Sequence, residues 1–439
     1  MKPIKSNNQT DRRHNLTDHD LFRISPFLAD LAGDGSWGQL SAGPIAEEDD
    51  QPDNASNPPE GVREFLNRVS HLLTDPEAIL KDLRQFRIRS LLSLAAIDLS
   101  GRIQPHQLRR RLIRLNEALM QAAWHVADEC LRQRFVHPLV LERRNVNPPM
   151  AVFSLSRLGS GDPWYTTGPS PIFVHTRAAE FAPSLSEKDF AAARRTGKEW
   201  LPAREYFHRL ARRILSFLSV PDAAGKGFDR MAEEPATNPG PSLLPGSLVV
   251  LYSAFEEHFG GRIPLKERLS LLRLRFITGQ EPLGRAVETL ARESLRRLSL
   301  ELGPRLRPSL NAWYRDRAQA EHLPLDHGSL LDIERGLRLI QFRCAVDDPE
   351  FLEPSPCKSM DFLAGRNIIS REQRLILFRS YSWQWFLINR MSLLDMRTIA
   401  HWQALKTGSL DETLDLPNAA TKTVKLMKSA HEVLKELES

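Results

Sequence analysis

Residues 150–161 read MAVFSLSRLGSG, and this stretch decides the predicted fold. Its apolar beginning, 150–155, predicts a buried strand, and the glycine-rich sequence at 159–161 predicts a tight turn. The apolar run Pro171–His175 predicts the next strand, and residues 247–252 predict a further short one. These strands indicate a small mixed α/β domain in the middle of the chain.

Helical patterns lie on both sides of this domain. Apolar residues recur at helical spacing from Val62 to Leu73, and Asp75-Pro76 supplies an N-cap and a first-turn proline for a second helix. A third amphipathic run covers 105–132, and from Pro264 onward the pattern is helical again. The sequence therefore predicts an α+β fold that is mostly helical, with a mixed α/β domain between helical domains.

The chain of 439 residues divides into four predicted parts. Residues 1–57 are polar and include an acidic run, which predicts a disordered tail. Within this tail, the apolar patch 21–28 is a candidate for docking onto the body or onto a partner. A leading helical region at 58–145, the mixed domain at 146–285 and a C-terminal helical domain at 286–439 follow.

Composition limits the possible functions. There are 60 Lys and Arg against 55 Asp and Glu, and a net charge of +5 argues only weakly for a polyanionic partner. The three cysteines are far apart and match neither a disulfide framework nor a zinc motif. A signal peptide or a membrane span needs a long apolar stretch, and the sequence contains none. We therefore expect a cytoplasmic protein.

Five segments follow a recognisable pattern in a fixed order. They are LRQFRIRSLL at 83–92 with DLSG at 98–101, SRLGSGD at 156–162, GSLV at 246–249 leading to Ala254-Phe255, KERLSLLRLR at 266–275 and GSLLDIE at 328–334. Together they resemble the glutamine synthetase adenylyltransferase family over roughly residues 60–410. The resemblance implies that 146–285 is a nucleotidyltransferase-like domain, and that its active relatives transfer AMP to or from glutamine synthetase with Mg²⁺ and ATP.

The resemblance also implies where metal ligands should lie. Nucleotidyl transfer uses two Mg²⁺ ions about 4 Å apart, which carboxylates hold. The family's D-x-D pair falls on Gly168 and Ser170, so both carboxylates are replaced, and prolines flank Ser170 at a predicted interior strand. The third acid falls near Asp229, where the arginines that could face phosphates are lost. The sequence thus predicts a degenerate site without a bound metal.

Other residues leave alternatives open. Asp162 or Asp222 would be the substitute carboxylate if metal binding survives. The turn Gly159, Ser160 and Gly161 either offers amide groups to a nucleotide phosphate at a helix N-terminus or only links two elements. We favour the second interpretation of the turn.

Three charged or aromatic stretches elsewhere invite functional interpretations. The basic run Arg109–Arg114 is expected on a solvated helix face, as are the charged residues of 266–275. Asp332 and Glu334 either lie at an interface between domains or make ordinary caps and ion pairs, which we favour slightly. The aromatic run 381–386 is expected in the helical core rather than as a stacking platform.

The sequence favours a catalytically degenerate relative of the adenylyltransferase that acts as a binding or regulatory protein. The partners this implies are glutamine synthetase, a PII-type signal protein or a full-length homologue. No cofactor is expected, although an active enzyme would need Mg²⁺ and ATP. The alternatives are an active adenylyltransferase or deadenylylating enzyme with relocated metal ligands, and a basic scaffold that binds nucleic acid. A membrane partner is not expected.

Overall fold

The structure is a computed structural model, and it describes most of the chain from residue 60 onward. The described residues are 25, 28–29, 60–71, 75–136, 150–168, 170–176, 198–201, 203–218, 248–261, 263–394, 399–408, 414, 416 and 418–438. Most of the predicted tail, together with Pro169, Asp222 and Asp229, lies outside these residues.

Three leading helices match the predicted periodicity. They are α3 (Glu60–His71), α4 (Pro76–Leu99) and α5 (Pro105–Arg134). Asp75 caps α4 as expected, because its side chain accepts hydrogen bonds from two first-turn amides at 3.0 Å. Pro76 occupies the first turn, where a missing amide hydrogen costs nothing.

A four-stranded mixed sheet forms the centre of the molecule. Its strands are β2 (Met150–Ser154), β3 (Pro171–His175), β5 (Val249–Leu251) and β6 (Arg275–Gly279). The order is β5-β3-β2-β6, in which β2 is antiparallel to both neighbours and β3 is parallel to β5. A separate two-stranded parallel sheet pairs β1 (Phe135–Val136) with β4 (Glu199–Trp200). The three strands predicted for the central domain are confirmed.

Strand β6 corrects the prediction that the chain is helical throughout after Pro264. Only a short helix α9 (Leu265–Ser270) and a 3₁₀ turn η4 (Leu271–Arg273) precede this strand. Gly279 ends it at a φ of +107°, where a Cβ would lie 2.4 Å from the carbonyl oxygen of Met150 on β2. Pairing with β2 is a tertiary contact that the local pattern does not contain, and it overrides the helical periodicity.

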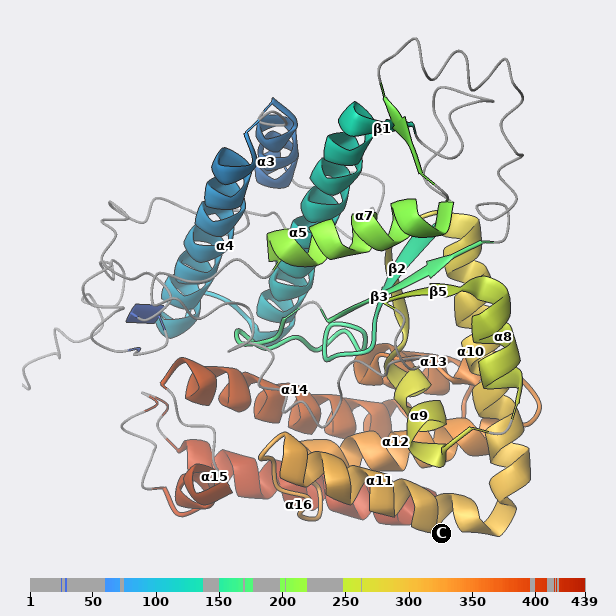
Figure 1. The fold of residues 1–439 in the computed structure, drawn as a ribbon. Coiled ribbons are helices and arrows are strands. Elements are labelled where there is room, and N and C mark those ends of the chain that lie inside the picture. Colours follow the sequence, from blue (N-terminus) through green and yellow to red (C-terminus); the bar gives the residue numbers. More distant parts are fainter. Residues whose placement is uncertain are drawn as a thin grey trace, which may run out of the picture.

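Helices cover the sheet from two sides. In Figure 1 the sheet lies between α5 and α7 (Ala203–Leu218) on one side and α8 (Tyr252–Gly260) and α10 (Glu281–Leu302) on the other. Such cover explains why all β2 side chains are buried and why all of them except that of Ser154 are apolar.

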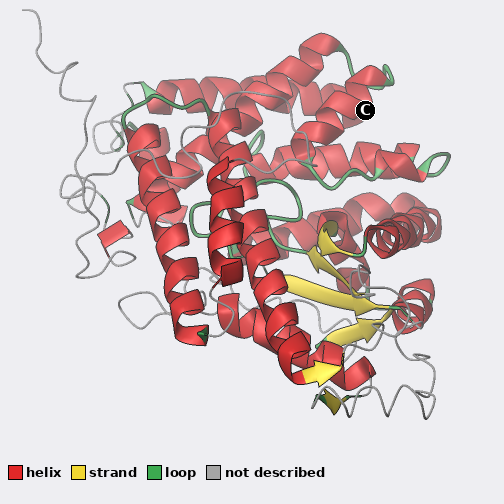
Figure 2. Ribbon diagram, turned by 90° about the horizontal axis from the view of Figure 1, so that it is seen from above, coloured by secondary structure: helices red, strands yellow, loops and turns green. Residues whose placement is uncertain are grey.

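A layer of C-terminal helices lies beneath the sheet in Figure 1. It contains α11 (Leu306–Ala320), α12 (Leu330–Cys344), α13 (Pro356–Gly365), α14 (Arg371–Leu393), α15 (Ile399–Lys406) and α16 (Ala419–Glu438), with 3₁₀ turns η5 (Gly303–Arg305) and η6 (Pro349–Phe351). Figure 2 shows how small the sheet is beside the helices, which confirms the predicted mostly helical α+β class. Among the described helices, none combines the length and the apolar character needed to cross a membrane.

The aromatic run at 381–386 belongs to the core, as predicted. Tyr381 and Trp385 on α14 are fully buried, and Phe386 is nearly so. One continuous hydrophobic core joins the leading helices, the sheet and the C-terminal layer. The segment between β2 and β3 passes between the sheet and α14 (Figure 1), so the core also surrounds the predicted glycine turn.

Two residues of the predicted tail pack against the body. Ser25 and Leu28 are both fully buried, and the hydroxyl of Ser25 donates to the carbonyl of Leu393 at the end of α14. The patch at 21–28 was a candidate for docking onto the body or onto a partner, and its described residues Ser25 and Leu28 contact the body.

Candidate functional site

Gly168 and Ser170, at the predicted metal positions, lie just before β3. Gly168 is buried and Ser170 is exposed, and the carbonyl of Gly168 accepts a 3.4 Å hydrogen bond from the hydroxyl of Ser156. Pro171 begins β3 and pairs with Ser154, so it stands at the first residue of a strand that keeps its register. We expected this proline to disturb the strand, but a first position tolerates it. Neither metal position offers a carboxylate.

Two threonines directly before Gly168 support a turn. Thr166 and Thr167 are buried, and the Thr167 hydroxyl accepts a 2.8 Å hydrogen bond from the amide of Trp164. These hydroxyls therefore face the protein interior.

The backbone amides of the glycine turn make local hydrogen bonds. The amides of Ser160, Gly161 and Asp162 donate to carbonyls inside the segment, at 3.3, 3.0 and 2.9 Å. The described segment 155–168 contains turns and bends but no helix, whereas a phosphate site of the predicted kind needs a helix N-terminus. A Cβ at Gly159 would lie 1.9 Å from the Arg273 carbonyl oxygen. These contacts favour the tight-turn interpretation.

Asp162, the first candidate for a substitute metal ligand, points into the core. It is fully buried, and its Oδ2 accepts a 2.7 Å hydrogen bond from the hydroxyl of Tyr381. Its Oδ1 lies 3.7 Å from Nη1 of Arg109. Burial raises the pKa of Asp162 to about 6, although Arg109 opposes the shift. This carboxylate is engaged with α5 and α14.

Arg109 corrects the prediction of a solvated basic face. Its side chain is 10% exposed, and Nη1 donates to the sulfur of Cys357 on α13 at 2.8 Å. Burial raises the pKa of the Cys357 thiol to about 12, against the opposing effect of the guanidinium. The first residue of the basic run is therefore a packing group between α5, α13 and the glycine turn. The sequence pattern of the glycine turn alone does not indicate that Arg109 contacts it.

Arg157, two residues before the glycine turn, is the centre of a buried charge cluster. Its guanidinium pairs with Glu334 of α12, with Nη1 and Oε1 2.7 Å apart, and with Glu321 after α11. The indole of Trp164 covers it at 4.7 Å. All three charged side chains are at most 5% exposed.

Two further arginines complete the cluster. Arg317 of α11 pairs with Glu334 at 2.8 Å, and Arg273 of η4 pairs with Glu321 at 2.8 Å. We call Arg157, Arg273, Arg317, Glu321 and Glu334 the buried ion cluster. Burial acts to raise the pKa of Glu334, but Arg157 and Arg317 outweigh burial and hold this pKa well below its usual range. The cluster fixes the segment between β2 and β3 to the C-terminal helices.

The buried ion cluster decides between the two interpretations of Asp332 and Glu334, which were an interface between domains or ordinary caps and ion pairs. Glu334 lies at the interface between the sheet domain and the helical layer, which is the interpretation we did not favour. Asp332 makes ordinary local contacts, since it accepts from the amide of Gly328 at 2.8 Å and pairs with Arg335.

The expected position of the charged residues at 266–275 on exposed helix faces is wrong for Arg268 and Arg273, which are buried, and for Arg275, which lies half-buried on strand β6. Arg273 belongs to the buried ion cluster. Arg268 is also buried, and it contacts Glu301 at 2.8 Å and the carbonyl of Gly261 at 2.7 Å. Arg268 and Arg273 stabilise the junction of sheet and helices. The periodicity of a single helix cannot reveal such contacts.

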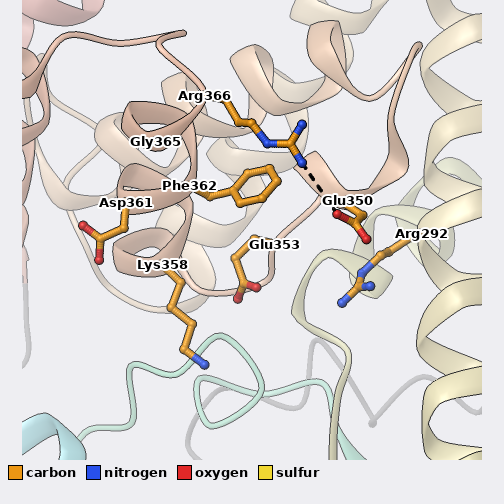
Figure 3. A pocket seen from close by; sticks show the side chains of 8 residues that line it. All are labelled: Arg292, Glu350, Glu353, Lys358, Asp361, Phe362, Gly365 and Arg366. Atoms are coloured by element: carbon orange, nitrogen blue, oxygen red, sulfur yellow. Dashed lines mark ion pairs between the residues drawn. The ribbon is translucent and has the colours of Figure 1, made fainter. Parts of the chain in front are cut away.

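An open depression of about 670 Å³ lies beside the turn. Figure 3 shows its mixed charges, which come from α10, from η6 and the residues directly after it, and from α13 with its C-cap: Arg292, Glu350, Glu353, Lys358, Asp361, Phe362, Gly365 and Arg366. Nη2 of Arg366 lies 3.9 Å from Glu350. The turn borders this region, because a Cβ at Gly161 would lie 3.3 Å from the Ser355 hydroxyl. Sequence reasoning missed the depression, since no pattern links its three elements.

Within the described residues, one group of three side chains has the spacing of metal ligands. It consists of His327, Asp332 and His431, whose ligand atoms lie within 4.8 Å of one another. This group lies between α12 and α16, away from Gly168 and Ser170. The fold brings its two histidines together from positions 104 residues apart, so no local spacing in the sequence reveals them.

One comparison with known proteins bears on the chain. A family model described as glutamate-ammonia ligase adenylyltransferase matches residues 25–289, which is more than half of the chain. The match runs from the docked Ser25 through the leading helices and the whole sheet into α10. The chain therefore belongs to the glutamate-ammonia ligase adenylyltransferase family.

Proposed function

We propose that this chain is a catalytically degenerate member of its family that acts as a binding or regulatory protein on glutamine synthetase, which is glutamate-ammonia ligase. The observation that carries the proposal is the identity of Gly168 and Ser170, where metal-binding aspartates are expected. Without carboxylates, nothing at these two positions offsets the charge of Mg²⁺.

The surroundings of the site support the same proposal. The amides of the glycine turn are used within the turn, so they are not free to hold a phosphate. Asp162 faces Arg109 and Tyr381 in the interior, so its recruitment as a metal ligand would break a buried network. Asp222, the other substitute considered, and Asp229, the possible remnant of the third acid, keep open the alternative of an active enzyme with relocated ligands.

The depression beside the turn is the candidate contact surface for glutamine synthetase. Lys358 is exposed at its edge, and Lys358, Arg292 and Glu353 point into the space between α10 and α13 (Figure 3). Charges of both signs at an exposed edge steer and orient a protein partner. The depression therefore supplies a defined place at which to test the interaction.

The alternative of a nucleic-acid scaffold has less support. Its proposed surface was the basic run on α5, yet Arg109 is buried against Cys357 and Asp162. If glutamine synthetase is not the partner, a purified PII-type protein or a full-length homologue takes its place in the same binding experiment.

The test measures binding of the purified chain to purified glutamine synthetase by biolayer interferometry, in the presence of Mg²⁺ and ATP. We expect saturable binding together with a change in synthetase activity. Lys358→Glu should weaken binding at least tenfold, whereas Lys266→Glu, an exposed lysine on α9, should not change it. Absence of binding to glutamine synthetase would overturn the proposed partner, and equal binding by both variants would overturn the proposed surface.

A further inference from the structure

The beginning of α12 and the middle of α16 bring three potential metal ligands together. His327 precedes α12, Asp332 lies in its first turn and His431 lies on α16. The two imidazole rings face each other, with centroids 4.4 Å apart and a tilt of 33°. The two helices pack against each other, so the arrangement joins the last helix to the body (Figure 1).

The backbone holds this arrangement closely. Gly328, at a φ of +72°, lies so near α16 that a Cβ would be 1.9 Å from the carbonyl oxygen of Met427. Met427 is one helical turn before His431 and shares its face. The carbonyl of Gly328 accepts a 2.9 Å hydrogen bond from Gln384 on α14. His327, next to Gly328, is thus positioned by contacts with two other helices.

Asp332 is oriented by its own partners and keeps capacity for a further bond. Its Oδ1 accepts two hydrogen bonds from Arg335, at 3.1 and 2.8 Å, and its Oδ2 accepts one from the amide of Gly328. A carboxylate oxygen accepts about two bonds, so Oδ2 retains one position. Arg335 also pairs with Glu438 at 2.8 Å, so these three charged groups sum to one negative charge.

We propose that His327, Asp332 and His431 form a binding site for a divalent transition-metal ion, with zinc as the best match. Two imidazole nitrogens and one carboxylate oxygen suit this class of ion, and three protein ligands leave a fourth position for water or for a ligand from outside. His327 is exposed, so that position is accessible. Outer partners such as Gly328 and Arg335 hold the carboxylate in place, as around known metal sites.

The site would link the C-terminal helix to the rest of the protein. The loop before α12 and the middle of α16 are separated by about a hundred residues, and a metal ion would connect them directly. Metal binding to the folded state alone then raises stability. This consequence can be measured without any assay of catalysis.

The test uses Co²⁺ as a spectroscopic probe and Zn²⁺ as the competitor on the full chain. We expect one Co²⁺ per chain, with visible absorption that Zn²⁺ removes, and a rise in melting temperature with Zn²⁺ that a chelator reverses. His327→Gln and His431→Gln should each weaken Zn²⁺ binding by at least the loss of about 10–100-fold that follows removal of a residue holding a metal ligand in place. Each substitution removes a ligand itself. Both variants should melt like the parent without metal.

His322→Asn is the matched control. His322 is an exposed histidine in the same connection, and asparagine suits its φ of +51°. It should leave the Co²⁺ spectrum, the affinity and the melting shift unchanged. Absence of stoichiometric binding by the parent, or undiminished binding in both glutamine variants, would overturn the proposed site.

Discussion

Arg157, just before the glycine turn, and Glu334, on α12, form a buried ion pair in which Nη1 and Oε1 are 2.7 Å apart. The two residues are 177 positions apart, and their side chains are 0% and 4% exposed. Because desolvated charges are costly unless they are paired, this contact holds the segment between β2 and β3 against the helical layer.

The first prediction concerns that pair. Glu334→Gln leaves Arg157 and Arg317 buried with only Glu321 to share, so the free energy of unfolding should fall by about 3–5 kcal/mol. Urea denaturation measures this loss. Glu281→Gln, which removes an exposed pair with Arg285, should cost at most about 1 kcal/mol. Equal effects of the two substitutions would mean that the buried ion cluster contributes no more than a surface pair.

The second prediction concerns Asp162 and pH. Because burial raises its pKa to about 6, the folded protein holds a proton there that the unfolded chain releases near pH 4. The protonated carboxyl of Asp162 therefore makes its full contribution to the free energy of unfolding below about pH 4, and this contribution is lost as the pH rises through about 6. The total change is on the order of 3 kcal/mol, since a pKa difference of one corresponds to about 1.4 kcal/mol.

The measurement compares the parent with Asp162→Asn from pH 4 to pH 7. The parent should lose stability relative to the variant across this interval, and the difference should become constant above about pH 7. A difference that does not vary with pH would show that Asp162 has an ordinary pKa, contrary to its buried position.

The third prediction concerns the docked N-terminal patch. Leu28 is fully buried, so Leu28→Ala should lower the free energy of unfolding by about 2–5 kcal/mol. Leu300→Ala, at a leucine that is 53% exposed, should change it by less than about 0.5 kcal/mol. Thermal or urea unfolding compares the two. If removal of residues 1–57 by proteolysis leaves the melting temperature unchanged, the patch does not contribute to stability.

The fourth prediction is that restored carboxylates do not restore activity. Gly168 is buried and Ser170 is exposed, so aspartates at both positions need not converge on one metal ion. Gly168→Asp with Ser170→Asp should lose about 3 kcal/mol, because one new charge is buried without a partner, and Mg²⁺ should recover part of the loss. The double asparagine variant, Gly168→Asn with Ser170→Asn, controls for side-chain volume without the charge. Efficient AMP transfer by the double aspartate variant would contradict this prediction.

Local sequence was sufficient for much of the fold. The cap at Asp75, the apolar runs of β2 and β3 and the helical stripes are short-range signals, and each produced the expected element. The proposed replacement of metal-binding carboxylates at Gly168 and Ser170 also rests on the sequence alone, because it depends on residue identity.

Long-range pairing could not be predicted in the same way. Strand β6 depends on its antiparallel partner β2, and Arg109 depends on Cys357, which is 248 positions away. Basic residues on an isolated helix favour solvent, so only the packing of α5 against α13 and the turn reveals that one of them is buried. The ligand group at His327 and His431 escaped detection for the same reason.

Transfer of AMP to glutamine synthetase tests the central claim most directly. The full chain is incubated with glutamine synthetase, labelled ATP and Mg²⁺ or Mn²⁺, beside an active adenylyltransferase that shows the substrate is competent. Because we propose that Gly168 and Ser170 replace metal-binding aspartates, we expect labelling no greater than in the absence of the chain. Labelling above that background that disappears in Asp222→Asn or Asp229→Asn would contradict the account, because it would show a working metal site built from relocated carboxylates.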